Sequence, residues 1–172
     1  MTSKQSQASK DIVQEALSFR VPQATDGAAL HQLVANCPPL DPNSLYCNLL
    51  QCSHFADTAV AVEYEGELVG FISGYIPPNK PDTLFVWQVA VDSSMRGQGL
   101  GGRMLGELVD RTGVKWMETT VTPDNGASWG MFRSFARKRN AECEDCGPLF
   151  ERDAHFGGQH DSEHLARLGP FK

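Results

Sequence analysis

The segment Val89 to Gly102 places a glycine-rich turn between an apolar strand and a helix, and it limits the possible folds more than any other part of the chain. Glycines at 97, 99, 101 and 102 carry no Cβ atom, so the backbone N–H groups of the turn can approach an anion closely. The N-terminus of the following helix adds a partial positive charge, and Arg96 adds a full one. We therefore interpret this segment as a pyrophosphate cradle.

Turn and capping residues divide the chain into short elements. We predict a strand over 18–21, a helix from Thr25 or Asp26, an ordered proline-rich loop over 37–42 and a second helix from Asn43 or Ser44 to about residue 54. A hairpin over 58–64 and 67–75 and a strand over 84–91 then suggest an antiparallel meander. After the cradle we expect a helix over 99–110, a strand over 116–121 and a helix over 128–137.

The length of 172 residues and a hydrophobic content of 41% favour a single globular domain. We expect residues 1–16 to form a flexible N-terminus and residues 17–172 to form the domain, with an acidic, irregular C-terminal segment over 141–172. The net charge of −6 argues against nucleic acid as a partner, and no apolar run is long enough to span a membrane. The polar N-terminus and an odd number of cysteines predict reduced thiols and a cytoplasmic location.

Gly97, Gly99 and Gly102 also satisfy the dinucleotide-binding pattern G-x-G-x-x-G, with Glu118 placed where a ribose ligand would be expected. That fingerprint normally turns directly out of its strand and begins a long array of parallel strands. Here additional residues separate the strand from the turn, and an antiparallel meander precedes it. We therefore disfavour a dinucleotide site.

Arg96-x-x-Gly99-x-Gly101, after a strand that ends in Val-Ala-Val, resembles the coenzyme A loop of the Gcn5-related N-acetyltransferase (GNAT) superfamily. The resemblance implies a single-domain α/β (α+β) fold, with a mixed, mostly antiparallel sheet flanked by helices. It also implies acetyl-CoA as co-substrate and no metal. The cofactor-binding residues that it implies are Val89, Val91, Arg96, Gly97, Gln98, Gly99, Leu100, Gly101, Asn125 and Ser128.

Four further blocks, at 38–46, 83–91, 118–128 and 156–163, resemble the family of L-2,4-diaminobutyrate acetyltransferases of ectoine biosynthesis. This resemblance implies acetylation of the 4-amino group of L-2,4-diaminobutyrate, a step toward an osmoprotective compatible solute. The resemblance places Asp41 and Glu163 at the substrate side, and we assign them as catalytic residues together with Tyr46, which is chosen for the chemistry of its hydroxyl. The substrate-binding residues are then Asp41, Ser44, Tyr46, Phe85, Trp87, Thr120, His160, Asp161 and Glu163.

The chemistry of such a reaction is consistent with these residue types. An alkyl ammonium with a pKa near 10.4 must lose a proton before it can attack a thioester, and the α-ammonium of the substrate needs an anion to hold it. Tyr46 could donate a hydrogen bond or reprotonate the leaving thiolate. By the strand period of two, Trp87 should share a face with Phe85, Val89 and Val91, either as core or as an aromatic wall of the site.

Cys143, Cys146, His160 and His164 fit the spacing of a Cys₂His₂ zinc site. The helix of such a finger would have to pass through Gly157 and Gly158, at a cost of about 1 kcal/mol each. Residues 141–164 also hold seven acids and one base, whereas a finger that reads DNA would be basic. We therefore expect no metal.

Two other functions remain open at this stage. One is an acetyltransferase for another amine, such as a polyamine, an amino acid or a protein N-terminus, and the other is a non-catalytic regulator that binds acetyl-CoA. Blocks 38–46 and 156–163 favour the diaminobutyrate enzyme over the first alternative, since the cradle is common to both. An exposed strand edge near the C-terminus would suit a homodimer.

Overall fold

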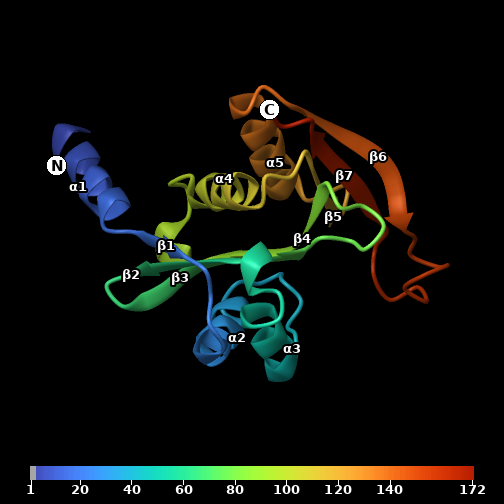
Figure 1. Ribbon diagram of the computed structural model, residues 1–172, viewed down its shortest axis with the longest axis horizontal. Helices are drawn as coiled ribbons and strands as arrows, with labels where there is room; N and C mark the ends of the chain where they lie inside the picture. The colour runs from blue at the N-terminus through green and yellow to red at the C-terminus, as the bar shows by residue number, and fades with distance from the viewer. Residues whose placement is uncertain (1–2) are drawn as a thin grey trace.

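The computed structural model describes residues 3–172, which form a seven-stranded sheet with helices on both faces (Figure 1). The strand order is β1-β2-β3-β4-β5-β7-β6, and only β4 and β5 pair in parallel, so the sheet is mixed and mostly antiparallel, as predicted. The strands are β1 (Ser18–Arg20), β2 (Val60–Tyr64), β3 (Glu67–Tyr75), β4 (Thr83–Val91), β5 (Trp116–Val121), β6 (Glu142–Phe150) and β7 (Glu163–Gly169).

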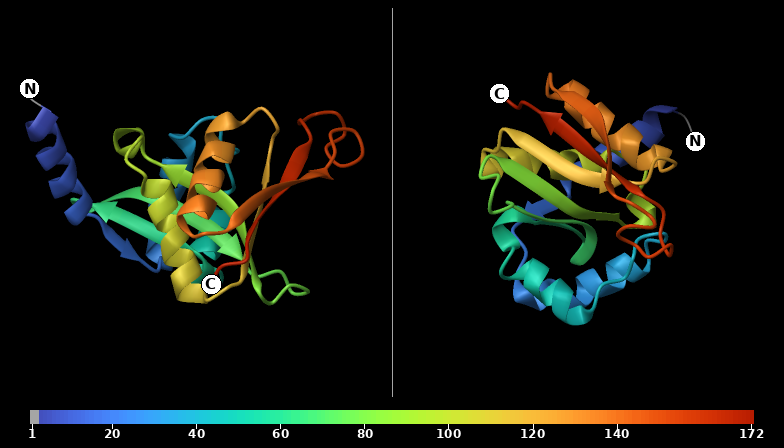
Figure 2. Two further views of the ribbon diagram at one scale, coloured as in Figure 1. Left: turned by 90° about the horizontal axis from the view of Figure 1, so that it is seen from above. Right: turned by 90° about the vertical axis from the view of Figure 1, so that its right-hand side faces the viewer.

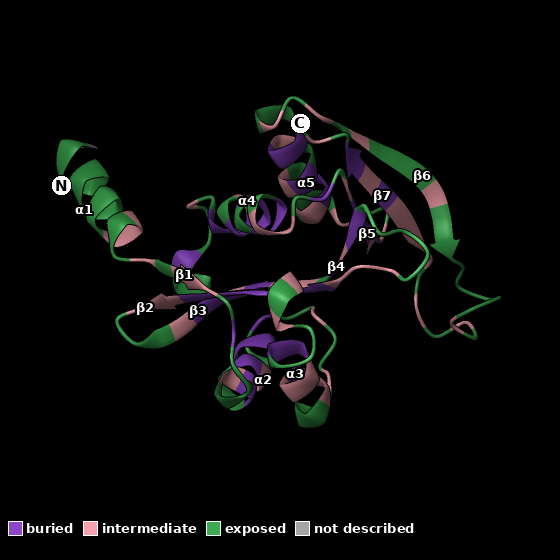
Figure 3. Ribbon diagram, viewed as in Figure 1, coloured by how far each residue is buried: buried purple, intermediate pink, exposed green. Residues whose placement is uncertain are grey.

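Helices α2 (Gly27–Ala35) and α3 (Leu45–Cys52) cover one face of the sheet, and α4 (Leu100–Thr112) and α5 (Gly126–Lys138) cover the other (Figures 1 and 2). Helix α4 buries an apolar stripe against the sheet (Figure 3); the stripe consists of Leu100, Met104, Leu105 and Leu108. Within residues 3–172, no helix combines the length and the apolar character needed to cross a membrane.

Strands β4 and β5 pair only at their beginnings. The parallel register joins Thr83 to Trp116 and ends at Phe85 and Glu118. Beyond that point β4 stays paired with β3, while β5 stays paired with β7. The buried hydroxyl of Thr119 donates a hydrogen bond of 2.9 Å to the carbonyl of Val86, close to the point of separation. The second half of β4 therefore has no strand partner on the side that faces β5.

A β-bulge at Trp87 reverses the side-chain alternation of β4. Ser73 pairs with Gln88 and the next residue of β3 pairs with Val86, so Trp87 has no partner on β3. Val86 and Val89 both pack against the core on the α4 side, whereas Trp87 points to the α3 side. The prediction that Trp87 shares a face with Val89 and Val91 is therefore wrong, because a bulge breaks the period of two.

The prediction of an irregular segment over 141–172 is also wrong. Residues 142–150 and 163–169 form β6 and β7, which pair with each other and extend the sheet beyond β5. The exposed positions of β6 include both acidic and apolar residues, and register shifts around Pro148 interrupt the strand, so the sequence shows no regular alternation. The connection over 151–162 contains no helix or strand.

Most of the N-terminal segment that was predicted to be flexible is helical. Residues 3–15 form helix α1 (Ser3–Glu15), while residues 1–2 of the predicted flexible segment 1–16 lie outside the described residues. The helix is almost entirely exposed, so its sequence carries no apolar face that could have predicted it. Its last turn contacts the cradle, since the side-chain amide of Gln14 donates to the carbonyl and the side chain of Gln98.

Candidate active site

The glycine-rich turn after β4 has the geometry of an anion site. Gly97 and Gly99 both have a φ of +74°, a left-handed conformation that glycine adopts readily, and no atom lies within 4 Å of a Cβ placed on either one. In the part of the chain that the structure describes, the backbone N–H groups of residues 97–102 donate to no other backbone or side-chain group. These free donors lie at the N-terminus of α4, where the helix dipole favours an anion.

Two charged side chains flank this turn. Arg96 donates from Nε to the carbonyl of Val91 at 3.4 Å, which folds the guanidinium back onto the end of β4. Hydrogen bonds from the hydroxyl and the N–H of Ser94 hold the pKa of the Asp92 carboxyl below its usual range, so this residue is a carboxylate at neutral pH. Asp92 thus shapes the loop, while Arg96 supplies the positive charge that a pyrophosphate requires.

Gly101 has a different reason to be glycine. A Cβ at this position would lie 2.4 Å from the sulfur of Met131, so its small size allows α4 and α5 to pack closely. The backbone N–H of Gly101 remains available to an anion, but the residue lacks a side chain because a larger one would clash with α5.

The backbone of β4 presents further donors where β4 and β5 have separated. The N–H of Asp92 bonds to β3 at Val69, and the N–H of Gln88 bonds to Ser73 of the same strand. Because amide direction alternates along a strand, the N–H groups of Val89 and Val91 point the other way, toward the side that β5 has left. This is where a thioester carbonyl could accept a hydrogen bond.

Two loops far apart in the sequence meet on the α3 side of the sheet. Nε2 of His160, from the β6–β7 connection, lies 4.0 Å from a carboxylate oxygen of Asp41, from the α2–α3 loop. The side chain of Gln88 holds the latter loop in place: it donates to the carbonyl of Asp41 at 2.8 Å and accepts from the side chain of Asn43 at 2.9 Å. Asp41 is 81% exposed, so its charge is open to a ligand from solution.

The predicted carboxylate Glu163 lies on the same side of the sheet. It begins β7, and the hydroxyl of Thr120 on β5 donates to it at 2.5 Å. Thr120 follows Glu118 on that face of the strand, and Glu118 is itself buried and paired with Lys80 at 2.9 Å. The neighbouring Asp161 and His160 come from the loop that leads into β7.

An aromatic surface adjoins these polar groups. The ring centroids of Tyr75 and Phe85 lie 5.3 Å apart, and Trp87 stands edge-on to Tyr75 at 6.3 Å. Phe55 extends the cluster, with its centroid 6.3 Å from that of Tyr75. Trp87 is 40% exposed, so it is a wall rather than core.

Sequence reasoning missed Gln88, Tyr75 and Phe55. A polar Gln88 inside an otherwise apolar strand was a usable signal, because such a residue needs a hydrogen-bond partner. The contact of Tyr75 with Trp87 depends on the bulge in β4, and no local sequence pattern predicts a bulge.

Four predicted site residues are either highly exposed or have another visible role. Tyr46 is 70% exposed on the first turn of α3, and within residues 3–172 its hydroxyl makes no hydrogen bond. The hydroxyl of Ser44 caps α3 by accepting from the N–H of Cys47, and the side chain of Asn125 caps α5 by accepting from the N–H of Ser128. Their contacts with substrate or cofactor remain predictions.

The four residues with zinc-finger spacing take up separate positions. Nδ1 of His164 contacts the carboxylate of Asp145 at 2.9 Å, and Nδ1 of His160 contacts the carbonyl of Asp161 at 2.6 Å. Cys143 belongs to a strand and not to a finger, because it pairs with Leu168 across the β6–β7 ladder. Among residues 3–172, no three His, Cys, Asp or Glu side chains are grouped so that they could hold a metal ion.

Known proteins share much of the sequence of this chain. The acetyltransferase (GNAT) family matches the chain over residues 28–136. The L-2,4-diaminobutyric acid acetyltransferase of Methylotuvimicrobium alcaliphilum is 51% identical over 91% of this chain and 92% of its own length. The enzyme of the same name from Vibrio parahaemolyticus is 47% identical over 90% of this chain and 86% of its own length.

Solved structures agree with these relatives. The diaminobutyrate acetyltransferase of Paenibacillus lautus, solved with its substrate L-2,4-diaminobutyric acid and coenzyme A, superposes with a TM-score of 0.84 at 39% identity, covering 91% of this chain and 96% of that one. The ribosomal-protein-S18-alanine N-acetyltransferase of Escherichia coli, at 15% identity and a TM-score of 0.70 over 91% of this chain and 95% of its own, shares the fold alone. This chain belongs to the acetyltransferase (GNAT) family and, within it, to the L-2,4-diaminobutyric acid acetyltransferases.

Proposed function

We propose that this protein transfers the acetyl group of acetyl-CoA to the 4-amino group of L-2,4-diaminobutyrate. The observation that carries the proposal is the position of Asp41, His160 and Glu163 at the separated ends of β4 and β5, since the cradle directly follows β4 in the chain. An acceptor amine and an acetyl donor would meet there.

The cradle fits the donor. The open space at Gly97 and Gly99, the free N–H groups of the turn and the Arg96 guanidinium suit a pyrophosphate. When bound, acetyl-CoA supplies an activated thioester. The N–H groups of Val89 and Val91 are placed to stabilise negative charge on its carbonyl oxygen, which is the charge that develops as the amine attacks.

The opposite side of the site fits a diamino acid. Asp41 and Glu163 can hold the α-ammonium by charge-assisted hydrogen bonds, so that the 4-amine points toward β4. Trp87 and Phe85 provide apolar surface for the methylene groups, and their π-faces favour an ammonium. His160, 4.0 Å from Asp41, can accept the proton that the attacking amine loses.

Thiol release measured across a panel of diamino acids and diamines tests the function, and NMR of the product tests the position of the acetyl group. We expect L-2,4-diaminobutyrate to be the best acceptor and to carry acetyl on the 4-nitrogen only. Lysine is two methylene groups longer, so its ε-amine would overshoot the thioester by about 2.5 Å and its kcat/KM should be at least about a hundredfold lower. Acetylation of the 2-nitrogen, or equal use of lysine, would contradict the proposed site.

We also propose an oligomeric state and a cellular location for the protein. The edge strand β6 exposes Leu149 and Phe150, which suits an interface with a second copy in a homodimer. All five cysteines are free thiols, which suits a cytoplasmic location. The product of the proposed reaction would serve ectoine biosynthesis and osmoprotection.

A further inference from the structure

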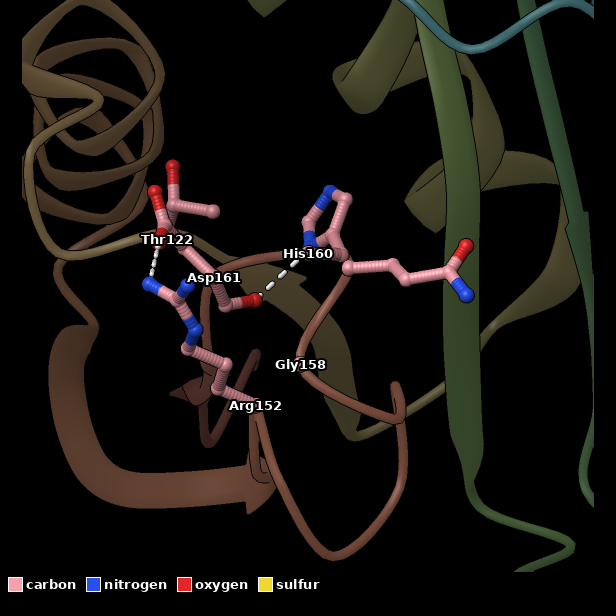
Figure 4. A pocket seen from close by; sticks show the side chains of 6 residues that line it. Thr122, Arg152, Gly158, His160 and Asp161 are labelled. Carbon is pink, nitrogen blue, oxygen red and sulfur yellow. Dashed lines mark hydrogen bonds and ion pairs between the residues drawn. The ribbon is translucent and has the colours of Figure 1, made fainter.

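A cavity of about 280 Å³ lies between the end of β5 and the β6–β7 loop, beside the proposed acceptor site (Figure 4). It is lined by Thr122, Arg152, Gly158, Gln159, His160 and Asp161. The acceptor site described above has carboxylates for the α-ammonium of a diamino acid, but the cations beside it, Lys80 and Arg167, both face the buried carboxylate of Glu118, at 2.9 Å and 3.8 Å. The α-carboxylate would need a permanent cation that no buried carboxylate already engages. Arg152 is such a cation, because its guanidinium stays charged at any physiological pH.

Arg152 stands out from its surroundings. It is the only Lys or Arg between residues 141 and 164, a stretch that holds seven acids. Hydrogen bonds hold both backbone polar groups of Arg152. Its N–H donates to the hydroxyl of Ser162 at 2.9 Å, and its carbonyl accepts from the N–H of Gly158 at 2.8 Å. The loop is thus ordered in a way that directs one cation into the cavity (Figure 4).

The guanidinium is available to a ligand. Its nearest anion is Asp161, with Nη1 and Oδ1 separated by 3.6 Å, which is longer than a hydrogen bond. Both side chains are more than half exposed, so this pair is weak. A carboxylate that enters the cavity can therefore accept hydrogen bonds from Arg152 without first breaking a strong ion pair.

The cavity adjoins the ammonium site, further along the chain from β5. Thr120 bonds Glu163, and Thr122, two residues further along the chain, lines the cavity, which corresponds to an advance of about 6 to 7 Å. His160 belongs to both places, since it lines the cavity and lies 4.0 Å from Asp41. An α-amino acid, with contacts of about 2.8 Å at its ammonium and its carboxylate, needs about 8 Å between the anion and the cation that bind it.

We propose that Arg152 binds the α-carboxylate of the acceptor and thereby selects diamino acids over plain diamines. This rests on the proposed function and adds the residue that distinguishes L-2,4-diaminobutyrate from an amine without a carboxylate. With Glu163 and Asp41 on the ammonium and Arg152 on the carboxylate, the α-carbon is held at two points, and the 4-amine is the group left free to reach the thioester.

The test compares two acceptors that differ only in the carboxylate, L-2,4-diaminobutyrate and 1,3-diaminopropane. We expect Arg152→Met to lower kcat/KM for L-2,4-diaminobutyrate by about ten- to a hundredfold and to leave that for 1,3-diaminopropane within about twofold. Arg152→Lys keeps the charge but cannot form a bidentate contact with a carboxylate. Its kcat/KM for L-2,4-diaminobutyrate should therefore lie between the values of Arg152→Met and the wild type. Arg137→Met, at an exposed position on α5, is the matched control and should change neither value.

The outcomes separate the two proposals. Equal losses on both acceptors would show that Arg152 only shapes the loop and would overturn its proposed role. A raised KM for acetyl-CoA, with the acceptor kinetics unchanged, would assign Arg152 to a coenzyme phosphate and would also overturn it. A wild-type enzyme that prefers 1,3-diaminopropane would overturn the substrate assignment itself and this inference with it.

Discussion

The imidazole of His160 and the carboxylate of Asp41 lie 4.0 Å apart, although the first belongs to the β6–β7 connection and the second to the α2–α3 loop. Neither loop contains a helix or strand that could hold it there by itself. Asp41 is instead positioned through its backbone, because Gln88 of β4 donates to its carbonyl. The acceptor site therefore depends on a hydrogen bond made by a residue that need not touch the substrate.

Replacing Gln88 tests this dependence. Gln88→Met keeps the volume of the side chain but loses the bonds to Asp41 and Asn43, so the loop should lose its fixed position. We expect kcat/KM for L-2,4-diaminobutyrate to fall about tenfold, with the Kd of acetyl-CoA unchanged. Initial rates and calorimetry measure the two quantities, and Gln88→Glu should restore part of the activity, since it can still accept from Asn43. A matching loss of acetyl-CoA affinity would mean that the whole of β4 had shifted.

Removing the cation of the cradle should weaken the donor alone. Arg96→Ala deletes a charge aimed at the pyrophosphate, so the Kd of acetyl-CoA should rise about ten- to a hundredfold, with a smaller effect on the KM of the amine. Gly99→Val should be worse, because Gly99 has a φ of +74°, which a branched residue adopts only with strain. Calorimetry with acetyl-CoA is the measurement, and equal affinity in the wild type and both variants would exclude the cradle assigned to this turn.

The ion pair at the start of the sheet makes stability depend on pH. Hydrogen bonds from Arg20 hold the pKa of the Asp26 carboxyl below its usual range. This contribution is complete above the unfolded pKa near 3.9 and is lost as the pH falls through the lowered value of the folded state. Asp26→Asn should therefore lower the free energy of unfolding by about 1 to 2 kcal/mol at pH 7, and by less at pH 2.5.

Urea titrations of both proteins at the two pH values give this difference. Asp57→Asn, at an exposed position, is the control and should leave the free energy of unfolding nearly unchanged. A deficit of the Asp26 variant that stays the same at both pH values would show that packing, and not charge, is responsible.

The cysteines should react in an order set by burial. Burial raises the pKa of the Cys52 thiol to about 12, and the side chain is completely inaccessible. Cys146 on β6 is exposed, although partial desolvation raises its pKa as well. Iodoacetamide at pH 8 should therefore modify Cys146 in the folded protein and Cys52 only after unfolding, as peptide mass spectrometry can determine. Early labelling of Cys52 would mean that α3 opens readily.

Much of the fold follows from local chemistry. The boundaries of β3 and β5 were predicted without error, because hairpin turns and prolines delimit them clearly in the sequence. The bulge in β4 was not predictable, since it results from pairing with β3. There a Cβ on Gly74 would come within 2.7 Å of the carbonyl of Phe85. Strands β6 and β7 were missed because their pairing is not local: β7 pairs with β5, more than forty residues away in the sequence, and β6 pairs with β7 across the connection over 151–162.

The candidate site divides in the same way. The cradle is contiguous in the sequence, so its glycines and Arg96 could be read directly as an anion site. The acceptor residues Asp41 and His160 could be named only through a family resemblance, because they meet through tertiary structure. Arg152 was passed over as the one base in an acidic stretch, and its significance depends on the cavity that it lines.

The brief pairing of β4 with β5 also has a mechanical consequence. Three register pairs, from Thr83 and Trp116 to Phe85 and Glu118, join the part of the sheet that carries Asp41 to the part that carries His160 and Glu163. An acceptor held by all three side chains would connect the two parts of the sheet. Bound substrate would then restrict movement between the two parts of the sheet where β4 and β5 separate, so the enzyme with substrate would be more rigid than the enzyme without it.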